Sequence, residues 1–347
     1  MDKFINFIRK ERLYILIFIF VLLFNAVILS RGGNKVKMGL QVTTRAPAFE
    51  DQEIKKREME KLLAKNEGLS MIFGLVSFLI MGIMLLGMII DIIILPMILT
   101  GRFDIRCLSP PQAKWNIWDV CKVVILFLFF GYMLILSETF LSRIFPVFKT
   151  DNFRMMVNSS ILDALAAVFI IYFTVIQHKE PLAALGISAR NFLKNVFYGV
   201  IGYIALIPVL ILMLVIIAGL INITKYAPER QPVVELFLKE KGAAFLTYSS
   251  LFAAIIGPVT EELFFRGFLY SALKKYIGIF WAMTATAGLF AALHAHIVGF
   301  FPIMALGMLL AYIYEKTGTL VSSVTVHMIH NLSMVVLVFL VKQIGII

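Results

Sequence analysis

Long apolar runs separated by short polar breaks are the feature that most constrains this chain. Residues 71–90 contain no charged side chain, and a helix of about 20 residues crosses the hydrocarbon core of a bilayer. Of the 347 residues, 61% are hydrophobic and 15% are charged, whereas soluble domains are about 45–50% apolar and about 25% charged. The sequence therefore predicts an integral, multi-pass membrane protein.

Further apolar runs predict helices along the rest of the sequence. The predicted helices cover residues 13–29, 71–90, 120–142, 159–177, 195–223, 243–257, 259–276, 279–296, 299–314 and 319–342. We expect eight or nine of them to span the membrane in an all-α helical bundle, with a cavity lined by the C-terminal helices. The last helices are separated at Pro258, Gly278, Gly299 and Gly318, residue types that commonly interrupt helices. Pro208 is expected to kink the helix that contains it.

The charged residues indicate a membrane protein rather than a nucleic-acid-binding one. The formal net charge is +11, but the basic residues cluster beside apolar runs, where they anchor helix ends near membrane lipids. No small-residue cleavage pattern follows the run at 13–29, so we expect an uncleaved anchor helix. The domain prediction is an N-terminal membrane region over 1–194, with a polar loop at 31–67, and a core over 195–347.

Ionisable side chains gather in the otherwise apolar C-terminal third. Four of the five histidines fall within 37 residues, and two adjacent glutamates precede them. Such groups are costly in a membrane helix unless they are paired or hydrated. A single histidine there is usually a packed structural residue, but this combination on three successive helices favours a functional site.

The spacing of the first group separates two roles. Glu262 and Arg266 are four residues apart with the acid first, the orientation that favours an ion pair on a helix. Glu261 is turned by about 100° from Glu262. We therefore predict that Glu262 and Arg266 form a structural clamp, and that Glu261 is a free carboxylate able to act as a general base.

The remaining polar residues lie on the following helices. His327 and Asn331 are four apart and share a face. Asn331 could donate an N–H group to a developing oxyanion, and His327 could bind a metal, a substrate carbonyl or the attacking water. His294 could approach from the opposite wall of the cavity, whereas His296 must point elsewhere and His330 could rim the site. The sequence lacks the HExxH and GxSxG patterns of other hydrolases.

Three motifs in this region resemble those of a known family. EExxxR is present at Glu261, Glu262 and Arg266, FxxxH at Phe290 and His294, and HxxxN at His327 and Asn331. Their order and spacing resemble the CAAX prenyl-protease and bacteriocin-processing (CPBP) family of intramembrane endopeptidases. The resemblance covers about 195–345, and an LGIS stretch at 185–188 is also similar to the family.

The resemblance implies an enzyme that hydrolyses a peptide bond in a membrane-associated or lipidated protein or peptide. In the catalytic roles that it implies, Glu261 activates the water, His294 and His327 hold the water, a metal or the substrate carbonyl, and Asn331 stabilises the oxyanion. His294, His327 and Glu261 would also form a zinc shell with one open position, but Glu261 would then be a ligand and another base would be needed. We favour the metal-free glutamate mechanism and keep zinc as an alternative.

Two other function classes fit parts of the sequence. A non-catalytic membrane scaffold, or a bacteriocin-immunity-type protein, would retain the same residues for structure alone. A proton-coupled transporter would use the Glu/His cluster as a relay, but no inverted repeat is evident. Replacing Glu261 by alanine distinguishes the enzyme from the scaffold, because only the enzyme should lose substrate processing.

Overall fold

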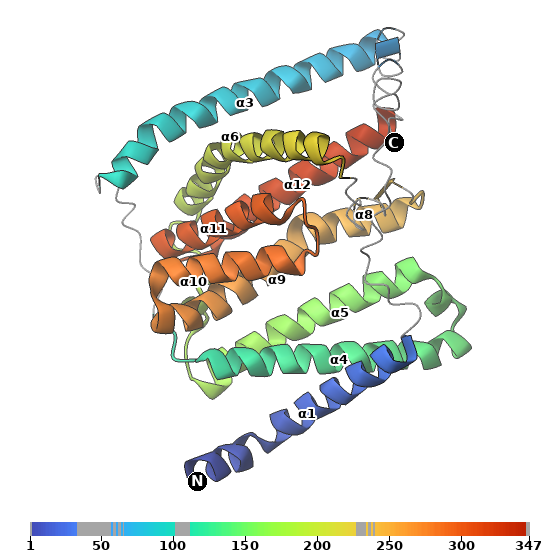
Figure 1. The fold of residues 1–347 in the computed structure, drawn as a ribbon, viewed down its shortest axis with the longest axis vertical. Helices are drawn as coiled ribbons and strands as arrows, with labels where there is room; N and C mark the ends of the chain where they lie inside the picture. The colour runs from blue at the N-terminus through green and yellow to red at the C-terminus, as the bar shows by residue number, and fades with distance from the viewer. Residues whose placement is uncertain are drawn as a thin grey trace. The chain divides into compact units, whose positions relative to one another are not determined.

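The computed structural model describes residues 2–32, 66–100, 112–226 and 240–344, together with isolated positions at 57–64 and 234–238. Every regular element in these ranges is helical, which confirms the predicted all-α fold (Figure 1). Most of the polar loop predicted at 31–67 lies outside the described residues.

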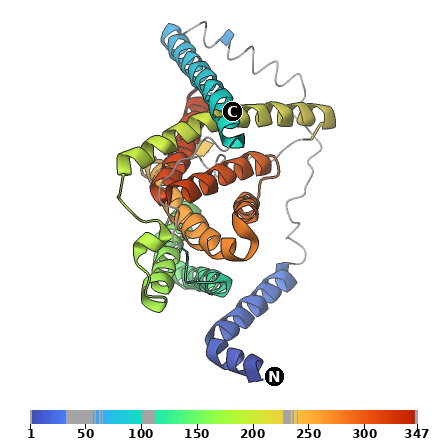
Figure 2. The ribbon, with the colours of Figure 1, turned by 90° about the vertical axis from the view of Figure 1, so that its left-hand side faces the viewer.

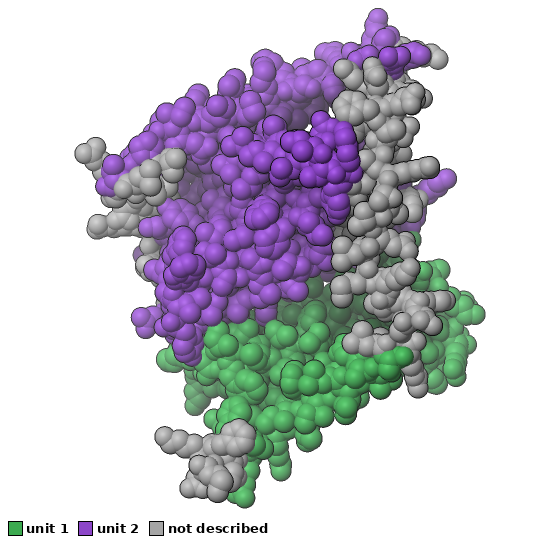
Figure 3. Space-filling model, in the orientation of Figure 1, with its two compact units in different colours: residues 1–42, 113–182 green, residues 43–112, 183–347 purple. Residues whose placement is uncertain are grey.

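The chain forms two compact units that interleave along the sequence. Residues 1–42 and 113–182 make unit 1, and residues 43–112 and 183–347 make unit 2 (Figure 3). The apolar helix predicted at 71–90 therefore belongs to the same unit as the C-terminal helices. The predicted division at residue 194 stays a prediction.

Unit 1 consists of α1 (Asp2–Gly32), α4 (Ile117–Ile144), the short η1 (Pro146–Lys149), α5 (Asp151–Ile171) and a wide π-helical turn, η2 (Tyr172–Gln177). A capping box starts α4. The Asn116 side chain accepts the backbone N–H groups of Trp118 and Asp119, and the Asp119 carboxylate accepts the N–H of Asn116 in return. These bonds satisfy donors that the first helical turn leaves open.

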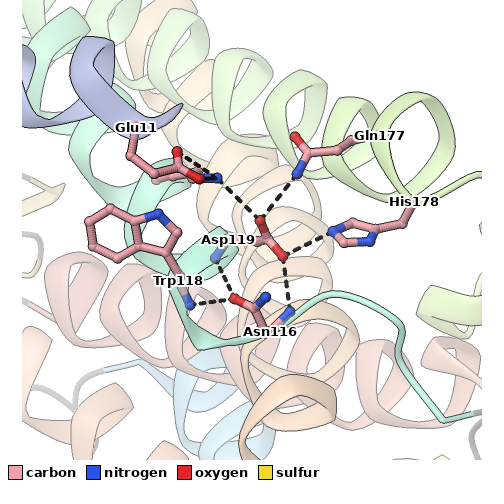
Figure 4. Close-up of polar contacts among 7 residues, drawn as sticks. Glu11, Asn116, Trp118, Asp119, Gln177 and His178 are labelled. Atoms are coloured by element: carbon pink, nitrogen blue, oxygen red, sulfur yellow. Dashed lines mark hydrogen bonds and ion pairs between the residues drawn. The ribbon is translucent and has the colours of Figure 1, made fainter. Parts of the chain in front are cut away.

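A buried charge network then ties α1, α4 and η2 together (Figure 4). Lys122 Nζ lies 3.0 Å from Glu11 Oε1 and 3.6 Å from Asp119 Oδ1. His178 Nε2 lies 2.9 Å from Asp119 Oδ2, and Gln177 donates to Asp119 Oδ1. Glu11, Asp119 and Lys122 are at most 5% exposed. His178, the one histidine of the sequence outside the C-terminal group, thus belongs to a structural network in unit 1.

Removing the cation from this network is expected to destabilise unit 1. Lys122→Met should lower the free energy of unfolding by about 3–5 kcal/mol, because Glu11 and Asp119 remain buried without their counter-charge. Lys114→Met is the matched control: its side chain is 68% exposed in an ion pair with Glu180, and such pairs contribute at most about 1 kcal/mol. Thermal unfolding in detergent measures both. Equal effects of the two variants would contradict the prediction.

Unit 2 holds the remaining long helices. They are α3 (Glu67–Leu99), α6 (Phe192–Thr224), α8 (Ala243–Leu251), α9 (Gly257–Glu262), α10 (Ser271–Leu293), α11 (Phe300–Thr317) and α12 (Leu320–Ile344), with π-helical turns η4 (Phe252–Ile256) and η5 (Leu263–Tyr270) on either side of α9. Its core lies between α6, α11 and α12. The buried core side chains are Tyr203, Leu206, Leu306, Leu310, Ile313 and Val326.

Small residues allow the helices of unit 2 to approach closely, as is common in membranes. A Cβ atom on Gly199 of α6 would lie 2.7 Å from the carbonyl oxygen of Ser322 on α12. A Cβ on Gly307 of α11 would lie 3.0 Å from the Cβ of Ala287 on α10. Figure 2 shows that α6 bends along its length, as expected from Pro208 within it.

Six helical segments among the described residues are long and apolar enough to cross a membrane. They are Ser70–Ile94, Ile117–Ile144, Asp151–Gln177, Phe192–Thr224, Ala243–Leu293 and Leu320–Lys342. The fifth is interrupted at Gly278, whose φ of 78° is not helical, and the chain reverses its direction there (Figure 1). The runs predicted at 13–29 and 299–314 are helical but are not among the six.

The predicted helix break at Pro258 is wrong. From α8 through η4, α9 and η5 the chain is continuously helical, and Pro258 lies in the first turn of α9. A proline lacks an N–H group and crowds the carbonyl of the residue four positions earlier. The widened turn η4 immediately precedes it and accommodates both effects. The predicted breaks at Gly278, Gly299 and Gly318 are confirmed.

Candidate active site

The predicted clamp between Glu262 and Arg266 is present at the junction of α9 and η5. Arg266 Nη1 donates to Glu262 Oε1 at 2.6 Å, and both side chains are at most 1% exposed. Arg266 Nη2 also donates to the carbonyl oxygen of Gly307 on α11, at 3.0 Å. The guanidinium carbon lies 4.8 Å from the ring centre of Phe290 on α10, within cation–π range. Arg266 therefore joins three helices.

Glu262 has a second partner that the sequence did not predict. His327 Nδ1 on α12 donates to Glu262 Oε1 at 3.0 Å, and the histidine is 2% exposed. Because an ionised carboxylate can only accept, this bond places a proton on Nδ1 and leaves Nε2 facing away from Glu262. The clamp thus orients His327 as well as Arg266.

Glu261 faces the other ring nitrogen of His327 and lies outside the ion pair of Glu262 with Arg266. Its Oε2 lies 3.6 Å from His327 Nε2, its side chain is 39% exposed, and that oxygen is buried without a hydrogen-bond partner. A separation of 3.6 Å is longer than a direct hydrogen bond. It allows a small group that lies beside both atoms, such as a water molecule, to contact the two of them at once. Two glutamates that are adjacent in sequence therefore present one neutralised and one available carboxylate to the same histidine.

His294 and Asn331 lie on the neighbouring helices. His294 follows the last residue of α10, where its Nδ1 donates to Phe290 O at 2.7 Å, and its ring packs against that of Phe290. The same phenylalanine ring also meets that of His327, with ring centres 5.5 Å apart. Asn331 Nδ2 donates to Ala253 O at 2.8 Å. Among the contacts of the described residues, none joins His294 or Asn331 directly to Glu261.

The two other histidines of this region have structural surroundings. His296 Nδ1 accepts the backbone N–H of Gly299, the residue that precedes α11. The ring of His330 meets the ring of Tyr203, with centres 5.9 Å apart. His296 therefore helps to start a helix, and His330 packs on α6.

The LGIS stretch at 185–188, which precedes α6 in the sequence, contacts the helices that carry the site residues. The carbonyl oxygen of Gly186 accepts the N–H of Leu320 at the start of α12, at 2.9 Å. Gly186 has a φ of 83°, and a Cβ there would lie 2.6 Å from the ring of Tyr314. A Cβ on Gly267 would lie 2.9 Å from the Leu185 carbonyl. The two glycines therefore allow this stretch to pack against Tyr314 of α11 and against η5, while Gly186 O also holds the start of α12.

The donor atoms of the site do not form a metal shell in this arrangement. Among the described residues, no group of three or more His, Cys, Asp or Glu side chains is placed to hold a metal ion. One ring nitrogen of His294 is bonded to Phe290 O and one of His327 to Glu262. The zinc shell of His294, His327 and Glu261 stays a prediction.

Two features of the site could not be found by sequence reasoning. The carbonyl of Gly307 carries no side-chain signal, and its contact with Arg266 depends on how α11 packs. The bond between Glu262 and His327 joins residues 65 positions apart. Both residues are polar groups in apolar segments, which suggests that each needs a partner. The spacing rules for a single helix cannot predict which residue of another helix that partner is.

Comparison with known proteins covers this same stretch. Residues 243–333 match the family described as type II CAAX prenyl endopeptidase, Rce1-like. The matched segment is thus similar to the Rce1-like family. It contains all six predicted site residues, and the match confirms the resemblance to CAAX prenyl proteases noted from the motifs. With the apolar helices, it indicates an integral, multi-pass membrane protein.

A curated relative matches part of the chain. It is the "Putative membrane peptidase YdiL" of Bacillus subtilis (strain 168), 26% identical over 85 residues, which are 24% of this chain and 35% of YdiL. The match thus spans about a third of the relative's length. No solved structure matches the chain at comparable stringency.

Proposed function

We propose that this protein is an intramembrane endopeptidase in which Glu261 activates a water molecule. The observation that carries the proposal is the division of labour between the adjacent glutamates. Glu262 is neutralised by Arg266 and orients His327, whereas Glu261 Oε2 has no hydrogen-bond partner and faces His327 Nε2 at 3.6 Å. A carboxylate in this position is suited to accept a proton from a water held between the two side chains.

The proposed reaction has two proton transfers. Glu261 takes a proton from the water while the oxygen of that water attacks the scissile carbonyl carbon. The protonated Glu261 then delivers the proton to the leaving amine as the C–N bond breaks. His327 Nε2 accepts a hydrogen bond from the same water and aligns it. The reaction needs no ion from solvent, because the proton that Glu261 takes from the water is the one that it later delivers to the amine. This suits a site among apolar helices.

Asn331 and His294 are proposed to contact the substrate. The Asn331 amide nitrogen carries two hydrogens, and one of them is donated to Ala253 O. The second can be donated to the oxyanion, a type of contact that contributes about 3–4 kcal/mol to lowering a barrier. His294 Nδ1 is bonded to Phe290 O, so Nε2 is the ring atom available to a substrate carbonyl or to water.

The substrate class follows from the surroundings. The residues of the site lie on helices whose outer faces are apolar, so the cleaved bond belongs to a membrane-associated protein or peptide. The matched family is named for CAAX prenyl endopeptidases, which supports a lipidated protein or peptide as the substrate. YdiL is named as a membrane peptidase, which agrees with the reaction type.

Comparison of membrane peptidomes tests this function. Cells carrying Glu261→Ala should accumulate one or more uncleaved precursors relative to wild type. Glu180→Ala, in the ion pair with Lys114 of unit 1, is the matched carboxylate control and should process normally. If Glu261→Ala cells show wild-type processing at normal protein abundance, the chain acts as a scaffold and the proposal fails.

Metal removal gives an independent prediction. Treatment of the purified protein with EDTA and 1,10-phenanthroline should leave precursor cleavage unchanged, because the proposed chemistry uses only protein groups and water. Cleavage is measured on the precursor identified from the peptidome. Loss of activity that zinc restores would replace this mechanism with the zinc alternative.

A further inference from the structure

The proline that precedes the two glutamates leaves a backbone carbonyl without a helical donor. In η4 the Gly257 N–H donates to Phe252 O, five residues back, rather than to Ala253 O. The next donor in a π-helical register would be residue 258, which is proline and has no N–H group. Both helical donors for the Ala253 carbonyl are therefore absent.

A side chain of the candidate site fills this place. Asn331 Nδ2 on α12 donates to Ala253 O at 2.8 Å. A backbone carbonyl without a partner is costly inside a membrane protein, so the bond satisfies Ala253 and at the same time fixes the rotation of the Asn331 amide. Residues 253, 257 and 261 follow one another at four-residue spacing, which places the anchor on the same face of the helical rod as Glu261.

We propose that Pro258 is a positioning residue: by denying Ala253 O a backbone donor, it makes that carbonyl the anchor of the Asn331 amide and aims the second amide hydrogen at the reacting carbonyl. The inference rests on the proposed function for its catalytic meaning. The widened turn η4 contributes to this effect. In η4 the Gly257 N–H donates to Phe252 O instead of Ala253 O, and Pro258 has no N–H group to donate in its place.

Restoring the missing donor is the direct test. In Pro258→Ala, residue 258 can donate to Ala253 O in the wide register, or Gly257 can donate to it in the regular α-helical register. Either bond competes with Asn331. Misplacing a catalytic group by about 1 Å can cost about 100-fold in rate, so we expect kcat to fall by about 10-fold to 100-fold while KM stays unchanged. The thermal midpoint should equal or exceed that of wild type, because alanine favours a helix interior far more than proline does.

Pro208 in α6 offers a matched control. It also lies inside a helix, and the carbonyl of Ile204, four residues earlier, faces Gly87 of α3, which has no side-chain donor. Pro208→Ala should therefore alter the backbone in the same way without changing kcat. In a double-mutant cycle, Pro258→Ala should have little further effect on kcat when Asn331 is already alanine.

A spectroscopic measurement separates this inference from the proposed function. With ¹⁵N-labelled asparagine, the Asn331 side-chain signals, assigned by their loss in Asn331→Ala, should show one strongly hydrogen-bonded proton in wild type and in Pro208→Ala. That signature should be lost in Pro258→Ala. If Glu261→Gln retains activity, the proposed function fails, yet this signal still tests the anchor. An unchanged Asn331 signal in Pro258→Ala, or a Pro258→Ala protein less stable than wild type, would overturn the inference.

Discussion

Replacing Glu261 by glutamine is expected to lower kcat for precursor cleavage by about 100-fold to 10,000-fold, the usual contribution of a general base. Glutamine has the same shape but cannot take up the proton of the attacking water. The Glu261 side chain is 39% exposed and its Oε2 has no hydrogen-bond partner. The substitution should therefore change the free energy of unfolding by less than about 1 kcal/mol.

The adjacent residue provides the contrast for this experiment. Glu262→Gln removes the charge that Arg266 requires inside the protein, so it should lower both stability and activity. Kinetics and thermal unfolding in the same detergent distinguish the two variants. Wild-type turnover in Glu261→Gln would remove the carboxylate from the mechanism, and severe unfolding of that variant would show that Glu261 is structural.

Arg266→Met is expected to have the largest effect on stability, with a loss of about 3–5 kcal/mol in the free energy of unfolding. The substitution leaves the Glu262 carboxylate fully buried without its cation, and an unpaired buried charge costs this much. It also removes the bond to Gly307 O. Reduced abundance in the membrane and a lowered thermal midpoint measure the effect.

A double substitution separates stability from chemistry at the same pair. Arg266→Met with Glu262→Leu replaces both charges by apolar groups, which often restores stability. Cleavage should stay low in the double variant, because His327 loses the acceptor that fixes its Nδ1 proton. Recovery of full activity together with stability would show that the orientation of His327 by Glu262 is not needed.

Much of this site could be predicted from spacing along single helices. Glu262 and Arg266 are four residues apart, and this spacing predicted their ion pair. Glu261 is one residue earlier and therefore turned by about 100° around the helix, which predicted that it lies outside the pair. Gly278 and Gly318 were predicted as helix ends because glycine commonly interrupts helices, and both adopt a positive φ in the structure. These features depend on local geometry, which the sequence determines directly.

The contacts between helices could not be predicted in the same way. His327 meets Glu262 because α12 packs against α9 and η5, and no local pattern encodes that choice. Pro258 was interpreted as a break because proline usually ends helices in water. Here the π-helical turn η4 absorbs it, and a side chain from α12 takes over the unpaired carbonyl. Tertiary packing therefore overrode a correct local rule.

The charge network of unit 1 has a consequence for biogenesis. Glu11 leaves the ribosome 111 residues before Lys122, its cation, and α3, which is synthesised between them, belongs to the other unit. The helix that carries Glu11 is therefore synthesised before α3, and its counter-charge becomes available only when α4 has been made. Nascent chains arrested before Lys122 should be held by insertion factors or degraded, because Glu11 has not yet met its counter-ion.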